Sequence, residues 1–194
     1  MLHKTFRASL CAGLIAAALA IPAVQAADLA SMNIPEKAEV ASQSLLLNGA
    51  GIRTKIVFDV YAAALYTVAK TSDAAAVINA ATPRRVELRM MREVSASKMH
   101  ESFVEGLTAN VPDADKRFGS QLESLEKLFK EVKSVAKGDV ITLDFVPGQG
   151  TKVSIRGKAF PVITGDDFAS ALLSIWLGKK PVQGDLKAAL LGSK

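Results

Sequence analysis

Two kinds of hydrophobic pattern follow each other irregularly along the chain, and their order restricts the folds that it can adopt. Alternating apolar residues, or runs of β-branched and aromatic residues, predict strands in 44–68, 84–91 and 140–163. Apolar stripes and capping residues predict helices over 72–81, 95–110, 113–133, 165–178 and 183–192. This order is not the regular alternation of a parallel sheet. We therefore predict an α+β domain whose antiparallel sheet carries helices on one face, after an extended or poorly ordered lead-in at 27–42.

The first 26 residues have the three parts of a secretory signal peptide. They begin with Lys4 and Arg7, continue with an apolar stretch over 10–21, and end in the small-x-small triplet VQA. A membrane-spanning helix needs about 20 apolar residues, so the pattern favours cleavage over the alternative of a membrane anchor. We predict cleavage after this triplet, which leaves one domain at 27–194 and, in a cell with two membranes, a periplasmic location.

The composition after residue 26 excludes several kinds of chemistry. No cysteine remains, which excludes disulfides, a thiolate nucleophile and a cysteine metal site. The single histidine, His100, excludes a histidine cluster, and no serine lies in a GxSxG motif. Phosphate-binding and dinucleotide-binding glycine motifs are also missing. We therefore predict no cofactor and no metal.

The charge of the chain gives little support to a nucleic-acid partner. The formal net charge is only +5, and the arginines of 84–92 are interleaved with Glu87 and Glu93. Nucleic-acid binders usually present a clustered basic patch. We interpret these arginines as the solvated face of a strand.

Arg53 and Tyr61 are polar residues in a segment of mostly small and apolar ones, GAGIRTKIVFDVYAAALY at 49–66. An arginine stays charged on burial, so it must reach water or an anion. Its planar guanidinium matches a carboxylate, and a tyrosine hydroxyl can add a further donor. With apolar residues around them, the pair fits the polar end of a cleft for a fatty acid. The residues alone equally allow a surface arginine near a strand end and a tyrosine in the core.

Three stretches of the sequence resemble the bacterial, exported branch of the chalcone isomerase-like family. They are LNGAGIRTKIVFDVYAAALYT, LRMMREVSASKMHESFVEGL and SALLSIWLGKKPVQGDLKAALLG. The resemblance covers roughly residues 30–192. It implies an open-faced β-sandwich, in which a large antiparallel sheet carries a layer of helices, with a cleft between sheet and helices.

The resemblance also implies which residues would act in that cleft. Plant members of the family cyclise a chalcone to a flavanone, whereas fatty-acid-binding members hold an acyl carboxylate with an arginine and a tyrosine. Arg53 matches the arginine of both groups, and Tyr61 matches the tyrosine of the binders, where isomerases have a threonine. Residues 94–107 lack the tyrosine and asparagine with which isomerases bind and polarise the substrate ketone. The resemblance therefore favours a binding protein over an enzyme.

We predict a periplasmic protein that binds a fatty acid or a similar amphipathic carboxylate. Arg53 and Tyr61 would contact the carboxylate, and Ala63, Met99 and Phe103 would line the apolar part. One alternative is an intramolecular lyase that cyclises a chalcone or another enone through Arg53 and Tyr61. Another is an envelope interaction or structural protein with an empty cleft. The expected partner is a small amphipathic acid or a flavonoid-like molecule, without nucleic acid or stable membrane insertion, and the sequence does not identify a protein partner.

Overall fold

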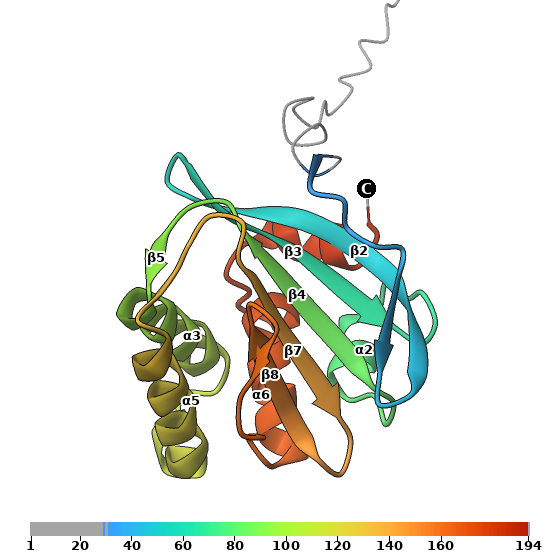
Figure 1. Cartoon of the computed structure of the whole chain (residues 1–194). Coiled ribbons are helices and arrows are strands. Elements are labelled where there is room, and N and C mark those ends of the chain that lie inside the picture. Colours follow the sequence, from blue (N-terminus) through green and yellow to red (C-terminus); the bar gives the residue numbers. More distant parts are fainter. Residues whose placement is uncertain (1–28, 30, 194) are drawn as a thin grey trace, which may run out of the picture.

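A seven-stranded antiparallel sheet forms the centre of the computed structural model, which describes residues 29 and 31–193 (Figure 1). The predicted signal peptide lies outside these residues. Neighbouring strands follow the order β1-β2-β3-β4-β7-β8-β9, and a small second sheet pairs β5 with β6. The strands are β1 (Lys37–Val40), β2 (Gln43–Lys55), β3 (Phe58–Thr67), β4 (Arg84–Met90), β5 (Val94–Ser95), β6 (Ser134–Val135), β7 (Val140–Val146), β8 (Gly150–Ile155) and β9 (Lys158–Ala159).

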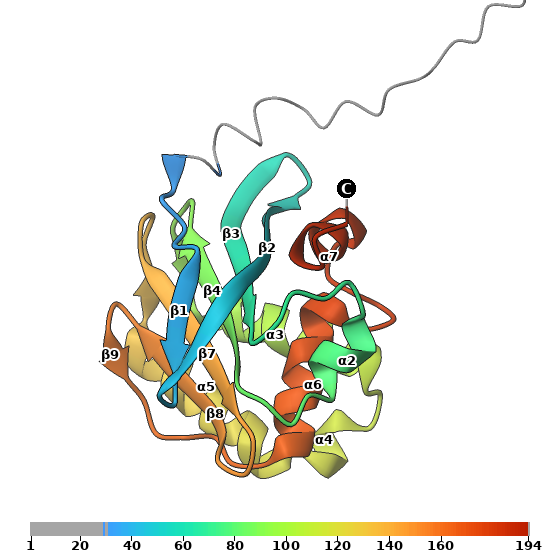
Figure 2. The ribbon, with the colours of Figure 1, turned by 90° about the vertical axis from the view of Figure 1, so that its right-hand side faces the viewer.

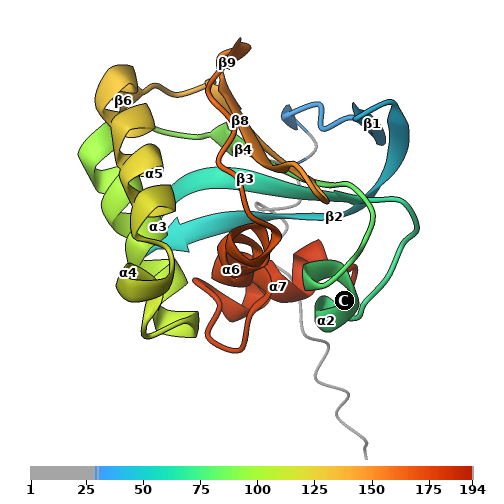
Figure 3. The ribbon, with the colours of Figure 1, turned by 90° about the horizontal axis from the view of Figure 1, so that it is seen from below.

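The helices cover one face of the sheet (Figures 2 and 3). They are α2 (Ala74–Ile78), α3 (Ala96–Asn110), α4 (Ala114–Arg117), α5 (Gly119–Val132), α6 (Asp166–Leu177) and α7 (Gly184–Leu190). Helix α7 packs on β2, α6 packs on β8, and α3 packs between α5 and α6. This arrangement confirms the predicted α+β fold with a helix layer on a large antiparallel sheet.

The side chains of β3 alternate between two cores, as the period of a strand requires. Tyr61, Ala63 and Leu65 belong to the main core between the sheet and the helices. Ala64 and Tyr66 belong to a smaller core on the opposite face, where β1 folds over the sheet. The Tyr66 hydroxyl donates to the carbonyl oxygen of Pro35 at 3.0 Å, which fastens the segment before β1 to the sheet.

Three details differ from the expectations. The lead-in at 27–42 contains a strand, because β1 pairs with β2 and buries Val40. The predicted helix over 113–133 is divided at Phe118. Its backbone is not helical, with φ −127° and ψ 26°, and its ring packs on Phe168 at a centroid distance of 5.5 Å. The strand signal over 44–68 is interrupted at 56 and 57, which form the turn between the end of β2 and the start of β3 at Phe58.

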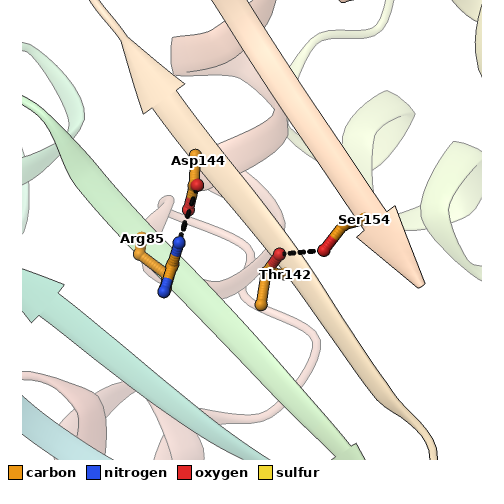
Figure 4. Close-up of polar contacts among 4 residues, drawn as sticks. All are labelled: Arg85, Thr142, Asp144 and Ser154. Atoms are coloured by element: carbon orange, nitrogen blue, oxygen red, sulfur yellow. Dashed lines mark hydrogen bonds and ion pairs between the residues drawn. The ribbon is translucent and has the colours of Figure 1, made fainter. Parts of the chain in front are cut away.

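Paired polar side chains cross the sheet from β4 to β8 on the face away from the helices (Figure 4). Arg85 donates two hydrogen bonds to the Asp144 carboxylate, at 2.5 and 2.8 Å, and the Thr142 and Ser154 hydroxyls lie 2.7 Å apart. On β4 itself, Arg89 bonds Glu87 at 2.7 Å. The arginine-rich strand therefore uses its charges within the protein. The interpretation of these arginines as a solvated face is wrong in part, because Arg84 and Glu87 are buried.

Candidate functional site

A cavity of about 640 Å³ lies between the β2–β3 hairpin and helices α3 and α6. Residues from these elements and from the segment after α6 line it. Its apolar wall is formed by Val60, Met99, Phe103, Ile175, Pro181 and Val182, among others. Its volume lies within the range of about 300–1,000 Å³ that is usual for small-molecule sites.

The pairing of β2 with β3 brings Arg53 and Tyr61 together on the wall of this cavity. The two residues are direct cross-strand partners, so their side chains leave the sheet on the same face. The register shifts between Arg53 and Thr54, which leaves Val60 without a partner opposite it. The irregularity adds Val60 to the apolar wall beside the polar pair.

The Arg53 guanidinium forms hydrogen bonds through one of its three nitrogen atoms, so its other N–H groups can donate to a ligand. Its Nη1 donates to the Thr54 carbonyl oxygen and, at 3.3 Å, to Gln183 Oε1. Gln183 Oε1 also accepts from the Thr54 N–H at 3.0 Å. Among the described residues, no carboxylate forms an ion pair with Arg53, and no hydrogen bond uses its Nε or Nη2. A partly buried cation with free donors suits a carboxylate ligand.

Tyr61 presents a neutral hydroxyl that can still donate a proton. Its oxygen accepts from Trp176 Nε1 at 3.1 Å, so the hydroxyl hydrogen is not used in this bond. Burial raises the pKa of Tyr61 above its ordinary value, against the opposing effects of the Trp176 hydrogen bond and the Arg53 charge. Trp176 is itself fixed by an edge-to-face contact with Phe103 at 5.6 Å.

The structure brings four of the five predicted ligand residues together. Arg53, Tyr61, Met99 and Phe103 all line the cavity. Ala63 is fully buried in the core and does not line it. The reason is that Ala63 pairs with Gly51, and α7 packs over this part of the sheet through Leu186 and Ala189.

Two supporting residues, Trp176 and Gln183, were not predicted from the sequence. They orient Tyr61 and Arg53 across sequence separations of 115 and 130 residues. The one signal available is that Trp176 is the single tryptophan, placed in the stretch WLGKKPVQG that also contains Gln183. Local periodicity cannot show which strand residues such side chains meet.

The charged residues of the cavity wall are mostly cations. Five positive side chains and two carboxylates line it. The positive side chains are Arg53, Lys55, Arg92, Lys98 and Lys180, and the carboxylates are Glu93 and Glu105. An excess of positive charge raises the local concentration of an anionic ligand.

The groups needed for other chemistry lie elsewhere or are missing from the described part of the chain. His100 lies on α3 beside Phe129, at a ring-centroid distance of 6.3 Å, and does not line the cavity. Residues 29 and 31–193 contain no cluster of His, Cys, Asp or Glu that could hold a metal ion. The hydroxyl groups on the cavity wall are those of Tyr61, Ser95 and Ser102.

Comparisons with known proteins agree with this architecture. The sequence model of a family described as chalcone isomerase-like matches residues 26–192. The fold is similar to the crystal structure of the Arabidopsis thaliana fatty-acid binding protein AtFAP1, with a TM-score of 0.64 and 16% sequence identity over 81% of this chain and 90% of that one. At this identity the similarity shows the fold alone. A comparison with curated protein sequences finds no match.

Proposed function

The chain belongs to the chalcone isomerase-like family, and on that premise we propose that it is a periplasmic protein that binds a fatty acid or a similar amphipathic carboxylate without transforming it. The observation that carries the proposal is the cavity in which Arg53, free of any described ion pair, lies beside neutral Tyr61 at the edge of an apolar wall. The carboxylate would accept from Arg53 and Tyr61, and the alkyl chain would lie against Met99 and Phe103.

The energetics favour a ligand that uses both parts of the cavity. Each hydrogen bond between a charged group and its partner contributes about 1.5–3 kcal/mol. Each buried methylene adds about 0.8 kcal/mol. A short acid such as acetate would use only the polar end, so affinity should rise with chain length until the cavity is full. The similarity in fold to a protein described as fatty-acid binding supports the same choice of ligand.

Native mass spectrometry of the protein, purified without detergent, tests the proposal against an Arg53→Ala variant. We expect a bound acyl mass in the parent protein and its loss in the variant. Arg156→Ala is a matched control, because Arg156 pairs with Asp139 outside the cavity. An acyl mass that persists in Arg53→Ala would contradict the assignment of the site.

The alternative activity, cyclisation of a chalcone, would use the same cavity and the same two side chains. Such an enzyme must stabilise charge that develops on the ketone oxygen, and of the tyrosines only Tyr61 lines this cavity. Loss of the absorbance of a chromogenic chalcone measures the reaction directly. Turnover that depends on Arg53 would replace the binding proposal with the lyase.

The proposed location has its own test. The predicted signal peptide should be removed after residue 26, so N-terminal sequencing of the protein from a periplasmic extract should begin at Ala27. An uncleaved chain in the membrane fraction would contradict this part of the proposal.

A further inference from the structure

The turn between β2 and β3 exposes three large hydrophobic side chains in sequence. Ile56 is 89% exposed, Val57 76% and Phe58 56%. This hairpin tip, residues 56–58, projects beyond the body of the domain at the upper left of Figure 1. Among the described residues, the other large hydrophobic side chain with comparable exposure is Val162, at 42%, which lies elsewhere on the surface.

The residues of the tip do not suit its turn. Lys55 pairs with Phe58, so Ile56 and Val57 form a two-residue hairpin turn, and Ile56 has a φ of 60°. The first position of such a turn favours glycine, because its φ is positive. A β-branched residue with a positive φ is strained. Strain of this kind tends to occur at functional positions. Neither turn geometry nor solubility explains two exposed aliphatic residues here.

Two positive charges lie next to the tip. Lys55 precedes it and is exposed, and the Arg92 guanidinium lies over the Phe58 ring at 4.6 Å from its centroid. Lys98 stands on the same cavity wall but pairs with Glu101 at 2.8 Å.

Two acidic groups of this region are already bonded: Asp59, directly after the tip, accepts from the Thr54 hydroxyl at 2.6 Å, and Glu101 pairs with Lys98. The carboxylates on the cavity wall are Glu93 and Glu105, against the five cations given above. The tip thus combines exposed apolar groups with two exposed cations, Lys55 and Arg92, that form no ion pair among the described residues.

We propose that the hairpin tip docks on the surface of an anionic lipid bilayer. Ile56, Val57 and Phe58 would enter the boundary between head groups and acyl chains, while Lys55 and Arg92 would lie level with the phosphates. Apolar burial combined with basic residues is the usual basis of reversible binding to anionic membranes. A protein partner fits less well, because a stable interface buries about 800 Å² on each side, whereas this feature is a narrow convex tip.

Docking would also place the cavity next to the lipid. Lys55, Ile56, Phe58 and Arg92 belong both to the tip region and to the cavity wall. An acyl chain could then pass between bilayer and cavity without crossing water. This consequence rests on the proposed function, whereas docking itself does not.

Sedimentation with lipid vesicles tests the proposal. We expect the purified protein to sediment with vesicles of phosphatidylglycerol, and less with phosphatidylcholine or at high salt, because screening weakens exposed charges. The decisive variant is Ile56→Gly/Val57→Asn, which removes the aliphatic groups and installs residues that favour the turn. It should weaken vesicle binding by about tenfold or more, while the melting temperature stays equal or rises.

Control variants separate docking from other effects. Val162→Asn removes an exposed aliphatic group elsewhere and should not change vesicle binding. Lys55→Gln should weaken binding to phosphatidylglycerol by roughly fivefold. Arg53→Ala should lose acyl binding yet sediment normally, so the failure of one proposal is distinguishable from the failure of the other.

Three results would overturn the inference. The first is that the protein fails to sediment with phosphatidylglycerol, and the second is that Ile56→Gly/Val57→Asn binds these vesicles as well as the parent does. The third is that the parent forms a dimer without vesicles and the variant is monomeric, which would assign the tip to contact with a second copy of the chain.

Discussion

Replacing Tyr61 with phenylalanine should affect stability and ligand binding for two separate reasons. The Tyr61 oxygen accepts from Trp176 Nε1, and Trp176 is only 1% exposed. In Tyr61→Phe this buried donor loses its acceptor, which costs about 1–3 kcal/mol. For a domain of this size, 1 kcal/mol shifts the melting temperature by about 2–4 °C. The melting temperature should therefore fall by about 2–12 °C.

A double-mutant cycle separates the hydrogen bond from the lost volume. Trp176→Phe removes the donor, and Tyr61→Phe/Trp176→Phe removes both partners. Because the double variant leaves no unsatisfied donor, it should be more stable by about 1–3 kcal/mol than the sum of the single effects predicts. Acyl affinity should fall about 10- to 150-fold in both variants that lack the Tyr61 hydroxyl, because each loses one charge-assisted hydrogen bond.

Circular dichroism during heating measures stability in all variants, including those without the single tryptophan, and isothermal titration calorimetry measures acyl affinity. Tyr66→Phe is a matched control, since the Tyr66 hydroxyl bonds Pro35 on the opposite face of the sheet. It should lower stability without changing affinity. Additive single effects would refute the coupling between Tyr61 and Trp176. An unchanged affinity in Tyr61→Phe would refute the contact between its hydroxyl and the ligand.

Three further predictions concern packing, pH and ligand support. Gly49→Ala should lower the free energy of unfolding by about 1–3 kcal/mol, because the added methyl group would overlap the Ala189 carbonyl oxygen. Urea denaturation measures this change. Gly119 has open space around it, so Gly119→Ala should not lower the free energy of unfolding. Burial raises the pKa of Tyr66 to about 12, so its contribution to stability is present below its unfolded pKa of about 10 and is lost as pH rises through 12. Melting temperatures at pH 9 and 11.5 should show this loss, and Tyr66→Phe should reduce it. Gln183→Ala should weaken acyl binding by about 2- to 12-fold in calorimetry, because Arg53 loses one hydrogen bond.

Much of the fold could be predicted from the sequence because its signals are local. The alternation of Val86, Leu88 and Met90 places one face of β4 in the core, as the structure shows. Asp73 caps α2 by accepting from two backbone N–H groups, and aspartate is one of the residue types that signal a helix start. Both patterns depend on neighbours within a few residues.

The β2–β3 turn was missed because its residues favour strands. Ile56 and Val57 continue the β-branched pattern of 56–68, and the glycine or asparagine that signals a tight turn is missing. The short strand β1 was missed because four residues give too little alternation to recognise.

The candidate site could be predicted only in part. Arg53 and Tyr61 lie on adjacent strands of one hairpin, so their meeting follows from nearby sequence. Ala63 was predicted to line the apolar part of the cleft, whereas α7 occupies the space over its cross-strand partner, Gly51. A strand of small residues shows that something lies against it, but not whether this is a ligand or a helix.

The hydrogen bonds that hold Arg53 and Tyr61 also determine when the site can exist. Gln183 and Trp176 lie 130 and 115 residues after the side chains that they support. While the chain is being synthesised, the β2–β3 hairpin is complete long before these partners emerge, and contacts over such separations form late. The protein therefore cannot bind its ligand before Trp176 and Gln183 have been synthesised and packed against the hairpin. A protein shortened before α6 would keep both ligand-contacting residues but lack Trp176 and Gln183, and so would lack a formed site.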